Sequence, residues 1–153
     1  MRKIFVDMDG VVADFDTHYE RHFGVRLNRW PGPDKTDWDK VRSVPDFFRT
    51  IPKMADADEL LDGIRPRPFE MLTGIPKSID KVDNDKVWWI GENVKPTPPV
   101  TCCPAREKCL HGKPGDVLID DYLKYADMWI AMGGIFIHHT SAAESLRVLN
   151  GLD

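Results

Sequence analysis

Two aspartates, Asp7 and Asp9, stand one residue apart and are followed at once by Gly10. They end an apolar run, from Lys3 to Val6, that is typical of a buried strand of a parallel sheet. Carboxylates favour neither the core nor a strand, and such a conflict between sequence and fold tends to mark a working site. One carboxylate could attack a bound phosphate while the other protonates the leaving oxygen and then activates water.

Other polar residues stand where later strands should end. Thr73 and Gly74 follow an apolar strand, and Asp120 and Asp121 follow another. The carboxyl ends of parallel strands share one crevice, so we expect these side chains to gather there with Asp7 and Asp9. Crowded carboxylates raise each other's pKa unless a cation offsets their charge, and hard oxygen ligands suit Mg²⁺. The amides at Gly10, the Thr73 hydroxyl and the amides from Gly74 onward could then hold a phosphate.

The elements that should position these residues alternate between strands and helices. Such alternation predicts an α/β fold, a Rossmann-like parallel sheet of about five strands with helices on both faces. The expected strands are 3–6, 69–72, 100–103, 116–119 and 135–138. The expected helices are 11–23, 56–62, 76–90 and 123–132, with Gly24, Gly63, Gly91 and Gly133 as stops, and a last helix that begins at a capping box, Ser141 to Glu144.

The chain's size predicts one domain. Its 153 residues suffice for a real core, and the irregular stretch 25–55 with its prolines and aromatics predicts a small helical insert. We expect a core of about 1–16 and 64–153 and a cap of about 17–63. A net charge of −4 without a basic run argues against a nucleic acid polymer as partner, and three cysteines fit a reducing compartment. The short apolar run before Asp7 predicts no secretory signal, and no stretch is apolar enough for a membrane span, so we expect a cytoplasmic protein.

Four motifs resemble those of the haloacid-dehalogenase-like phosphatases, and most of all the 5'(3')-deoxyribonucleotidase group. They are "DMDGVVADF", "LTGIP", a lysine in "REK" and "DVLIDD", and they occur in the family's order over nearly the whole chain. The resemblance implies a Mg²⁺-dependent phosphatase that acts on a small phosphomonoester through an aspartyl phosphate. It implies a nucleoside monophosphate as substrate and a cap after the first strand and helix.

Carried over to this chain, the resemblance makes Asp7 the nucleophile and Asp9 the acid and base. The remaining roles are phosphate binding for Thr73, Gly74, Lys108 and Lys77; metal binding for Asp7, the Asp9 carbonyl, Asp120 and Asp121; and packing on the nucleobase for Phe15, Trp38, Phe47 and Phe48. Two positions depart from the nucleotidase pattern, because Tyr122 replaces a common Arg and Gly74 a common hydroxyl residue. Both concern the substrate side and bear on nucleotide preference more than on the reaction.

Several alternatives stay open. The phosphate lysine is Lys108 or the nearby Lys113, with Lys108 favoured. The cap aromatics could hold a base or form the insert's own core. The sequence leaves a homodimer open and does not determine which of Asp120 and Asp121 would contact the metal directly. Alternative functions are a phosphatase for another phosphoester, such as a sugar phosphate, and a phospho-accepting receiver module, which the order of the acidic motifs disfavours.

Other interpretations of single motifs are weaker. An EF-hand loop from Asp7 would need Glu where His18 stands. The stretch "CCPAREKCLH" has no paired C-x-x-C spacing, which argues against zinc. His138 and His139 end a strand near the crevice, where we expect ordinary strand-end residues rather than functional ones.

Overall fold

Five parallel strands form one sheet at the centre of the molecule. The computed structural model describes residues 2–28 and 30–153; residues 1 and 29 of the predicted core and cap lie outside this description. The strands are β1 (Ile4–Val6), β2 (Phe69–Gly74), β3 (Val100–Cys103), β4 (Val117–Asp120) and β5 (Ile135–His138). Their order is β3-β2-β1-β4-β5, and every neighbouring pair is parallel. This confirms the predicted fold class.

Alternate residues of the strands supply two separate cores. Ile4 and Val6 belong to the larger one, with side chains of α3 (Ala57–Ile64), α4 (Val82–Asn93) and α6 (Ala142–Asn150). Phe5 belongs to the smaller core on the other face, where it contacts Trp129 of α5 (Ala126–Ala131) edge to face. Because successive strand residues point to opposite faces, this alternation turns Asp7 toward the α5 face.

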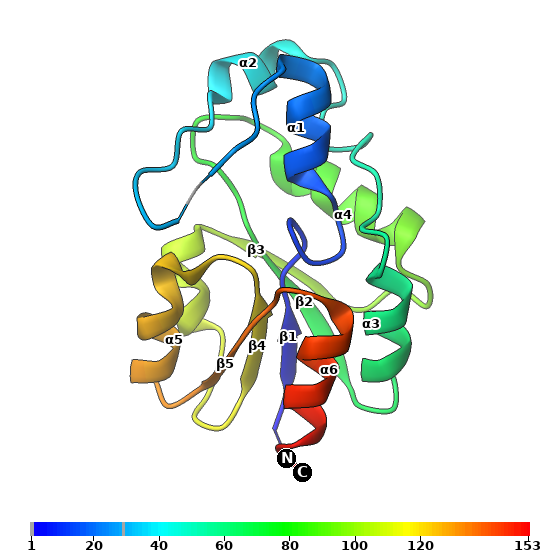
Figure 1. Cartoon of the computed structure of the whole chain (residues 1–153), viewed down its shortest axis with the longest axis vertical. Coiled ribbons are helices and arrows are strands. Elements are labelled where there is room, and N and C mark those ends of the chain that lie inside the picture. The colour runs from blue at the N-terminus through cyan, green and yellow to red at the C-terminus, as the bar shows by residue number, and fades with distance from the viewer. Residues whose placement is uncertain (1, 29) are drawn as a thin grey trace.

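The remaining elements lie around the carboxyl ends of the strands. Figure 1 shows α1 (Phe15–Phe23) and α2 (Trp38–Ser43) at the end of the molecule opposite the two termini. Two short 3₁₀ helices, η1 (Ala105–Leu110) and η2 (Leu123–Tyr125), follow β3 and β4. α3 falls within the range predicted for the cap, but it packs beside α6 against the sheet.

The segment between β1 and α1 is a tight turn rather than the first part of a helix. The backbone N–H groups of Val11, Val12 and Ala13 all donate to the Met8 carbonyl, and α1 begins only at Phe15. Asp14 caps this helix, because its carboxylate accepts a 3.3 Å hydrogen bond from the Thr17 N–H. The predicted start at Val11 was therefore wrong by about one turn, whereas Gly24 ends the helix as predicted, in the left-handed conformation.

Two predicted glycine stops were also wrong. Gly63 lies inside α3, where a Cβ would overlap the Leu146 side chain of α6, so its role is close helix packing. Gly91 lies inside α4, which begins at Val82 rather than Pro76. The predicted helix 123–132 is a 3₁₀ turn followed by α5. Gly133 follows that helix with φ +100°, as a helix stop would.

The last helix begins as predicted. The Ser141 hydroxyl accepts a 3.1 Å hydrogen bond from the Glu144 N–H, the N-cap half of a capping box. The Glu144 carboxylate instead pairs with Arg147 one turn later. Among the described residues, no helix combines the length and apolar character needed to cross a bilayer.

Candidate active site

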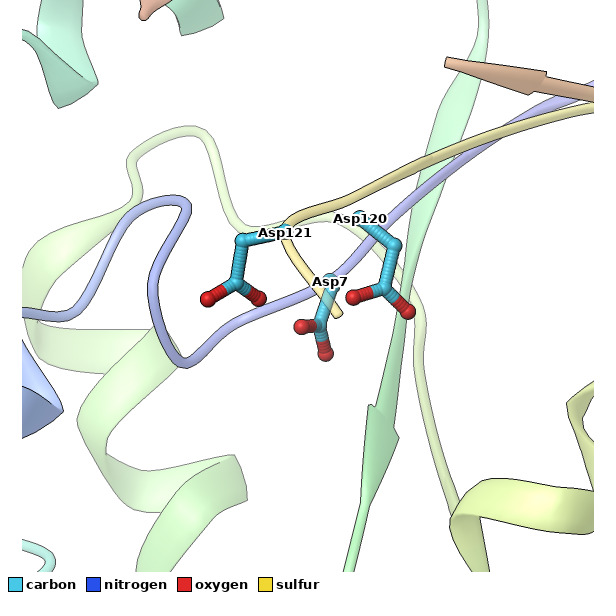
Figure 2. A group of neighbouring side chains, drawn as sticks. All are labelled: Asp7, Asp120 and Asp121. Atoms are coloured by element: carbon cyan, nitrogen blue, oxygen red, sulfur yellow. The ribbon is translucent and has the colours of Figure 1, made fainter. Parts of the chain in front are cut away.

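Three carboxylates meet at the carboxyl edge of β1 and β4. Asp7 directly follows β1, Asp120 ends β4 and Asp121 is the next residue. One oxygen atom from each lies within 4.8 Å of the others, and Figure 2 shows the three groups side by side. Asp7 and Asp120 are almost fully buried, whereas Asp121 is partly exposed. The sequence prediction that these strand ends share one crevice is confirmed for these three residues.

Gly10 makes room for this cluster. Its φ of +80° lies in the left-handed region, and a Cβ there would overlap the Asp121 carboxylate. Any larger residue would therefore combine backbone strain with a clash against that carboxylate. The glycine after the two aspartates is required by both the turn and the acidic pair.

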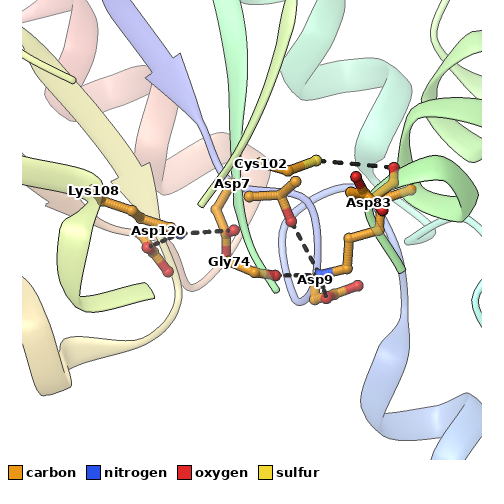
Figure 3. A network of polar contacts seen from close by, with 9 residues as sticks. Asp7, Asp9, Gly74, Asp83, Cys102, Lys108 and Asp120 are labelled. Atoms are coloured by element: carbon orange, nitrogen blue, oxygen red, sulfur yellow. Dashed lines mark hydrogen bonds and ion pairs between the residues drawn. The ribbon is translucent and has the colours of Figure 1, made fainter. Parts of the chain in front are cut away.

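Lys108 lies between two of the carboxylates. Its Nζ atom donates hydrogen bonds to Asp7 Oδ1 at 2.9 Å and to Asp120 Oδ2 at 2.8 Å, and all three side chains are buried (Figure 3). Although burial favours the neutral amine, Asp120 and Asp7 raise the pKa of Lys108, so the lysine stays charged. Of the two candidate phosphate lysines, Lys108 therefore lies at the carboxylate cluster. Lys113 is exposed, and it does not line the pocket that opens beside these carboxylates.

Asp7 is held in an unusual electrostatic environment. Burial, and then the neighbouring Asp120 carboxylate, raises its pKa to about 6, even though Lys108 acts in the opposite direction. The carboxylate cluster thus carries more negative charge than one lysine offsets. A divalent cation would supply the missing charge.

The donor set fits Mg²⁺. Three carboxylates with mutual oxygen separations below 5 Å offer hard oxygen ligands, and the open pocket beside them leaves room for water or a phosphate oxygen. Asp7, Asp120 and Asp121 would hold the ion. The two adjacent aspartates differ in burial, since Asp120 is buried and Asp121 partly exposed, and Asp120 accepts from Lys108 and from the Tyr122 N–H at 2.9 Å. A part for the Asp9 carbonyl in metal binding stays a prediction.

A second lysine, Lys86 of α4, connects Asp9 to β2. Its Nζ atom donates to Asp9 Oδ2 at 2.7 Å, to Thr73 Oγ1 at 3.1 Å and to the Gly74 carbonyl at 2.6 Å. Figure 3 shows the bonds that meet beside Asp9 and Gly74. The other Asp9 oxygen, Oδ1, is buried without a hydrogen-bond partner among the described residues. Asp9 is thus held through one carboxylate oxygen, while the other oxygen makes no hydrogen bond to the described residues.

Lys86 was missed in the sequence, although a signal was present. Val82 and Ile90 are four residues to either side of it, so the three share one helix face, and that face is buried. A lysine in the middle of an apolar helix face needs a buried acceptor. The sequence pattern could therefore have indicated an ion pair, but not that its partner is Asp9.

We expect Lys86→Met to destabilise the fold by about 3–5 kcal/mol, the usual cost of leaving one member of a buried ion pair alone. Lys86 is only 2% exposed, so water cannot replace it at Asp9 and Thr73. Urea unfolding measures the effect. The matched control is Lys77→Met, which is exposed and should change the unfolding free energy by about 0.5 kcal/mol or less. Equal stabilities of the two variants would contradict this account of Lys86.

The pocket contains many, but not all, of the predicted site residues. Its volume is about 240 Å³, and its lining includes Asp7, Asp9, Trp38, Gly74, Lys108, Asp120 and Asp121. Thr73 is buried just beneath it and bonded to Lys86. Lys77 is exposed and not part of the lining, so its contact with phosphate stays a prediction. Neither His138 nor His139 lines the pocket in the described chain; the His139 ring hydrogen-bonds to the Ser145 hydroxyl at 2.7 Å.

Three of the four predicted base-binding aromatics are buried. Phe15, Phe47 and Phe48 are 1%, 2% and 4% exposed, and the Phe15 ring contacts both of the others at centroid distances of 5.6 and 6.2 Å. Only Trp38 lines the pocket. The four rings pack together between α1, α2 and the segment that follows. Their contact with a base stays a prediction, and the three phenylalanines would have to separate to make it.

Comparisons with known proteins agree on the fold. No protein-family model and no curated protein matches the sequence. Among solved structures, a hydrolase from Streptococcus pneumoniae TIGR4 is similar, with a TM-score of 0.56, 10% identity and coverage of 97% of this chain and 98% of that one. L-2-haloacid dehalogenase from Xanthobacter autotrophicus has a TM-score of 0.56 at 9% identity, over 89% of this chain and 76% of the other.

The match with a third solved structure extends over the whole of this chain and the whole of that one. That structure is described as a putative beta-phosphoglucomutase from Thermotoga maritima, with a TM-score of 0.51 and 14% identity. The chain has the same fold as these three proteins. At such low identities the likeness concerns the fold alone.

Proposed function

We propose that the protein is a Mg²⁺-dependent phosphomonoesterase that removes phosphate from a nucleoside monophosphate through an aspartyl phosphate on Asp7. One observation carries the proposal: Asp7 directly follows the central strand, in contact with Lys108 and within 4.8 Å of the acidic pair at the end of β4. A nucleophile, a cation for phosphate and ligands for a metal thus stand together at one edge. The Streptococcus pneumoniae neighbour, which is called a hydrolase, shares the fold and agrees with this reaction class.

The proposed reaction has two steps. In the first, an Asp7 carboxylate oxygen attacks phosphorus, the bond from phosphorus to the ester oxygen breaks, and Asp9 gives its proton to the leaving oxygen. In the second, Asp9 takes a proton from water while the water oxygen attacks phosphorus, which releases inorganic phosphate and restores Asp7. Bound Mg²⁺ would supply positive charge that offsets the phosphate. Lys108 adds a second positive charge at the same place.

The position of Asp9 supports its proposed role. Lys86 fixes one oxygen of the carboxylate, and the other, Oδ1, which makes no hydrogen bond within the described part of the chain, is the atom that we assign to proton transfer. Asp9 also lines the pocket together with Asp7, so both proposed reaction steps take place on one wall. The nucleotide as substrate rests on the resemblance of the four motifs to the deoxyribonucleotidases, and the aromatic part of the pocket lining supports it.

A phosphate-release screen tests the proposed function. The purified protein with Mg²⁺ is supplied with deoxynucleoside and nucleoside monophosphates, sugar phosphates and p-nitrophenyl phosphate. We expect turnover that requires the metal and is most efficient on a deoxynucleoside monophosphate. Greater efficiency on sugar phosphates would contradict the nucleotide part, and the absence of repeated turnover on every ester would contradict the phosphatase.

Neutralising the acidic pair should raise the Mg²⁺ requirement. Asp120→Asn and Asp121→Asn each remove one negative charge from the cluster, so we expect half-maximal activity to shift to a higher Mg²⁺ concentration in both. Loss of a side chain that supports a metal ligand typically costs about 10- to 100-fold in metal affinity, and we expect loss of a ligand to cost at least as much. A magnesium titration of activity measures the shift, with Asp127→Asn, an exposed residue of α5, as the control. Unchanged titration curves in both variants would contradict the metal assignment.

A further inference from the structure

The pocket has a second wall that the predicted cap aromatics do not form. Beyond the carboxylates, three further side chains line the same cavity as Trp38 of α2: Tyr122, which directly precedes η2, Tyr125, which ends η2, and Met128 of α5. Met128 is 44% exposed, so its side chain is accessible from the cavity that it lines. This wall is therefore mainly apolar, with Lys124 between the two tyrosines, and it lines the same cavity as Asp7, Asp120 and Asp121, which are called the reacting edge below.

The two tyrosine rings of this wall lie close to each other, and Tyr122 also lies close to Trp30, which does not line the cavity. The Tyr122 and Tyr125 centroids are 6.3 Å apart with an interplanar angle of 32°, and Trp30 lies 6.4 Å from Tyr122 on the cap side. Lys124 Nζ is 5.4 Å from the Tyr125 centroid. At such distances aromatic rings pack against one another, and because Tyr122 and Tyr125 both line the cavity, they also border the space that a flat ligand group would enter.

Tyr122 is also tied to the reacting edge through its backbone. Its N–H donates a 2.9 Å hydrogen bond to Asp120 Oδ1, while Lys108 binds the other oxygen of that carboxylate. The backbone at Tyr122 is thus held beside Asp120, and its ring lines the same cavity as the predicted metal and phosphate residues. A group joined to phosphate through one sugar would extend from that edge along this wall.

Most of the cap aromatics are too buried to contact a ligand in the cavity. Phe15, Phe47 and Phe48 are between 1% and 4% exposed, so their faces are occupied by one another and by the rest of the cap core. Trp38 is the one member of that cluster that lines the cavity. A flat ligand group in the cavity would therefore meet Trp38 on the cap side and the tyrosines on the sheet side.

We propose that Tyr122 and Tyr125, with Trp38, form a binding site for the aromatic part of the leaving alcohol, which is the base of the departing nucleoside under the proposed function. This inference rests on that function and places the base against the wall that follows β4 rather than among the buried phenylalanines. It also gives a role to Tyr122, the residue at which the sequence departs from the nucleotidase pattern.

Two substrates that differ only in the base test the proposal. We would compare kcat/KM on thymidine 5'-monophosphate and on 2-deoxyribose 5-phosphate. Tyr122→Ala and Tyr125→Ala should each lower efficiency on the nucleotide by roughly ten-fold or more, since stacking on an aromatic is commonly worth that much. Efficiency on the sugar phosphate should scarcely change. Tyr122→Phe keeps the ring and should keep the nucleotide preference, and Ile130→Ala, an exposed residue of α5 outside the lining, is the control.

A binding measurement separates this inference from the proposed function. Calorimetry with the Asp7→Asn protein and Mg²⁺ reports binding of thymidine monophosphate without turnover. We expect Tyr122→Ala in that background to weaken binding by a similar factor. Equal losses on both substrates, or loss of binding with Phe47→Ala but not with either tyrosine variant, would overturn the subsite while the phosphatase stands. Thymidine monophosphate that binds through the tyrosines but is never hydrolysed would support the subsite and refute the proposed function.

Discussion

Replacing Asp7 by asparagine is expected to lower kcat on every phosphomonoester by at least about 10⁴-fold, the scale of loss when the attacking group is removed from a covalent mechanism. Asp7 directly follows the central strand, is 6% exposed and lines the pocket, and an amide of the same shape cannot form an acyl phosphate in its place. Steady-state phosphate release on a nucleotide and on p-nitrophenyl phosphate measures the loss.

The fold should survive this substitution. Burial and Asp120 already raise the pKa of Asp7, so the neutral amide removes a charge that the surroundings disfavour. Lys108 keeps its 2.8 Å ion pair with Asp120. Circular dichroism and the melting temperature supply the check. A folded Asp7→Asn protein with activity near that of the wild type would contradict covalent catalysis by Asp7.

Asp9→Asn should differ in kind from Asp7→Asn, because it removes the proton donor and leaves the nucleophile in place. General acid–base catalysis typically contributes about 10²–10⁴-fold. The loss should be largest for a nucleotide, whose alkoxide leaving group needs the proton. It should be smaller for p-nitrophenyl phosphate, whose leaving group departs without one. The ratio of kcat/KM values on the two substrates is the measurement.

Asparagine at position 9 still offers an oxygen to Lys86, so the bond that orients this side chain can persist. The comparison therefore isolates proton transfer better than an alanine variant would. Glu70→Gln is a control. Glu70 belongs to β2, pairs with Lys3 and does not line the pocket. Equal losses on both substrates would count against Asp9 as the acid.

The sheet and the acidic edge could be predicted because each follows from short stretches of sequence, the apolar runs and the aspartates directly after them. The apolar runs around Phe5, Met71 and Ile119 are buried strands, and parallel pairing then forces the carboxyl ends onto one edge. Asp7 and Asp120 meet because Val6 and Ile119 are partners in the register. The left-handed glycine at Gly24 was likewise predictable from its place after a helical stretch.

What could not be predicted depends on contacts between distant segments. Gly63 has the composition of a helix stop, but the approach of Leu146 from α6 explains its presence inside α3. The Lys86 bond to Asp9 joins residues 77 positions apart, which no local pattern encodes. The burial of Phe15 and Phe47 depends on how the cap packs on itself, so an aromatic-rich insert could not be separated from a base site by composition.

The most direct test of the account is a rapid-mixing experiment with the Asp9→Asn protein, p-nitrophenyl phosphate and Mg²⁺. Phosphoryl transfer to Asp7 needs little acid assistance with this substrate, whereas hydrolysis of the aspartyl phosphate needs Asp9 as base. We predict a burst of p-nitrophenol of about one equivalent per active site, with phosphate on Asp7 in the acid-quenched protein. Linear release without a burst, together with an unmodified Asp7 peptide, would contradict the covalent mechanism.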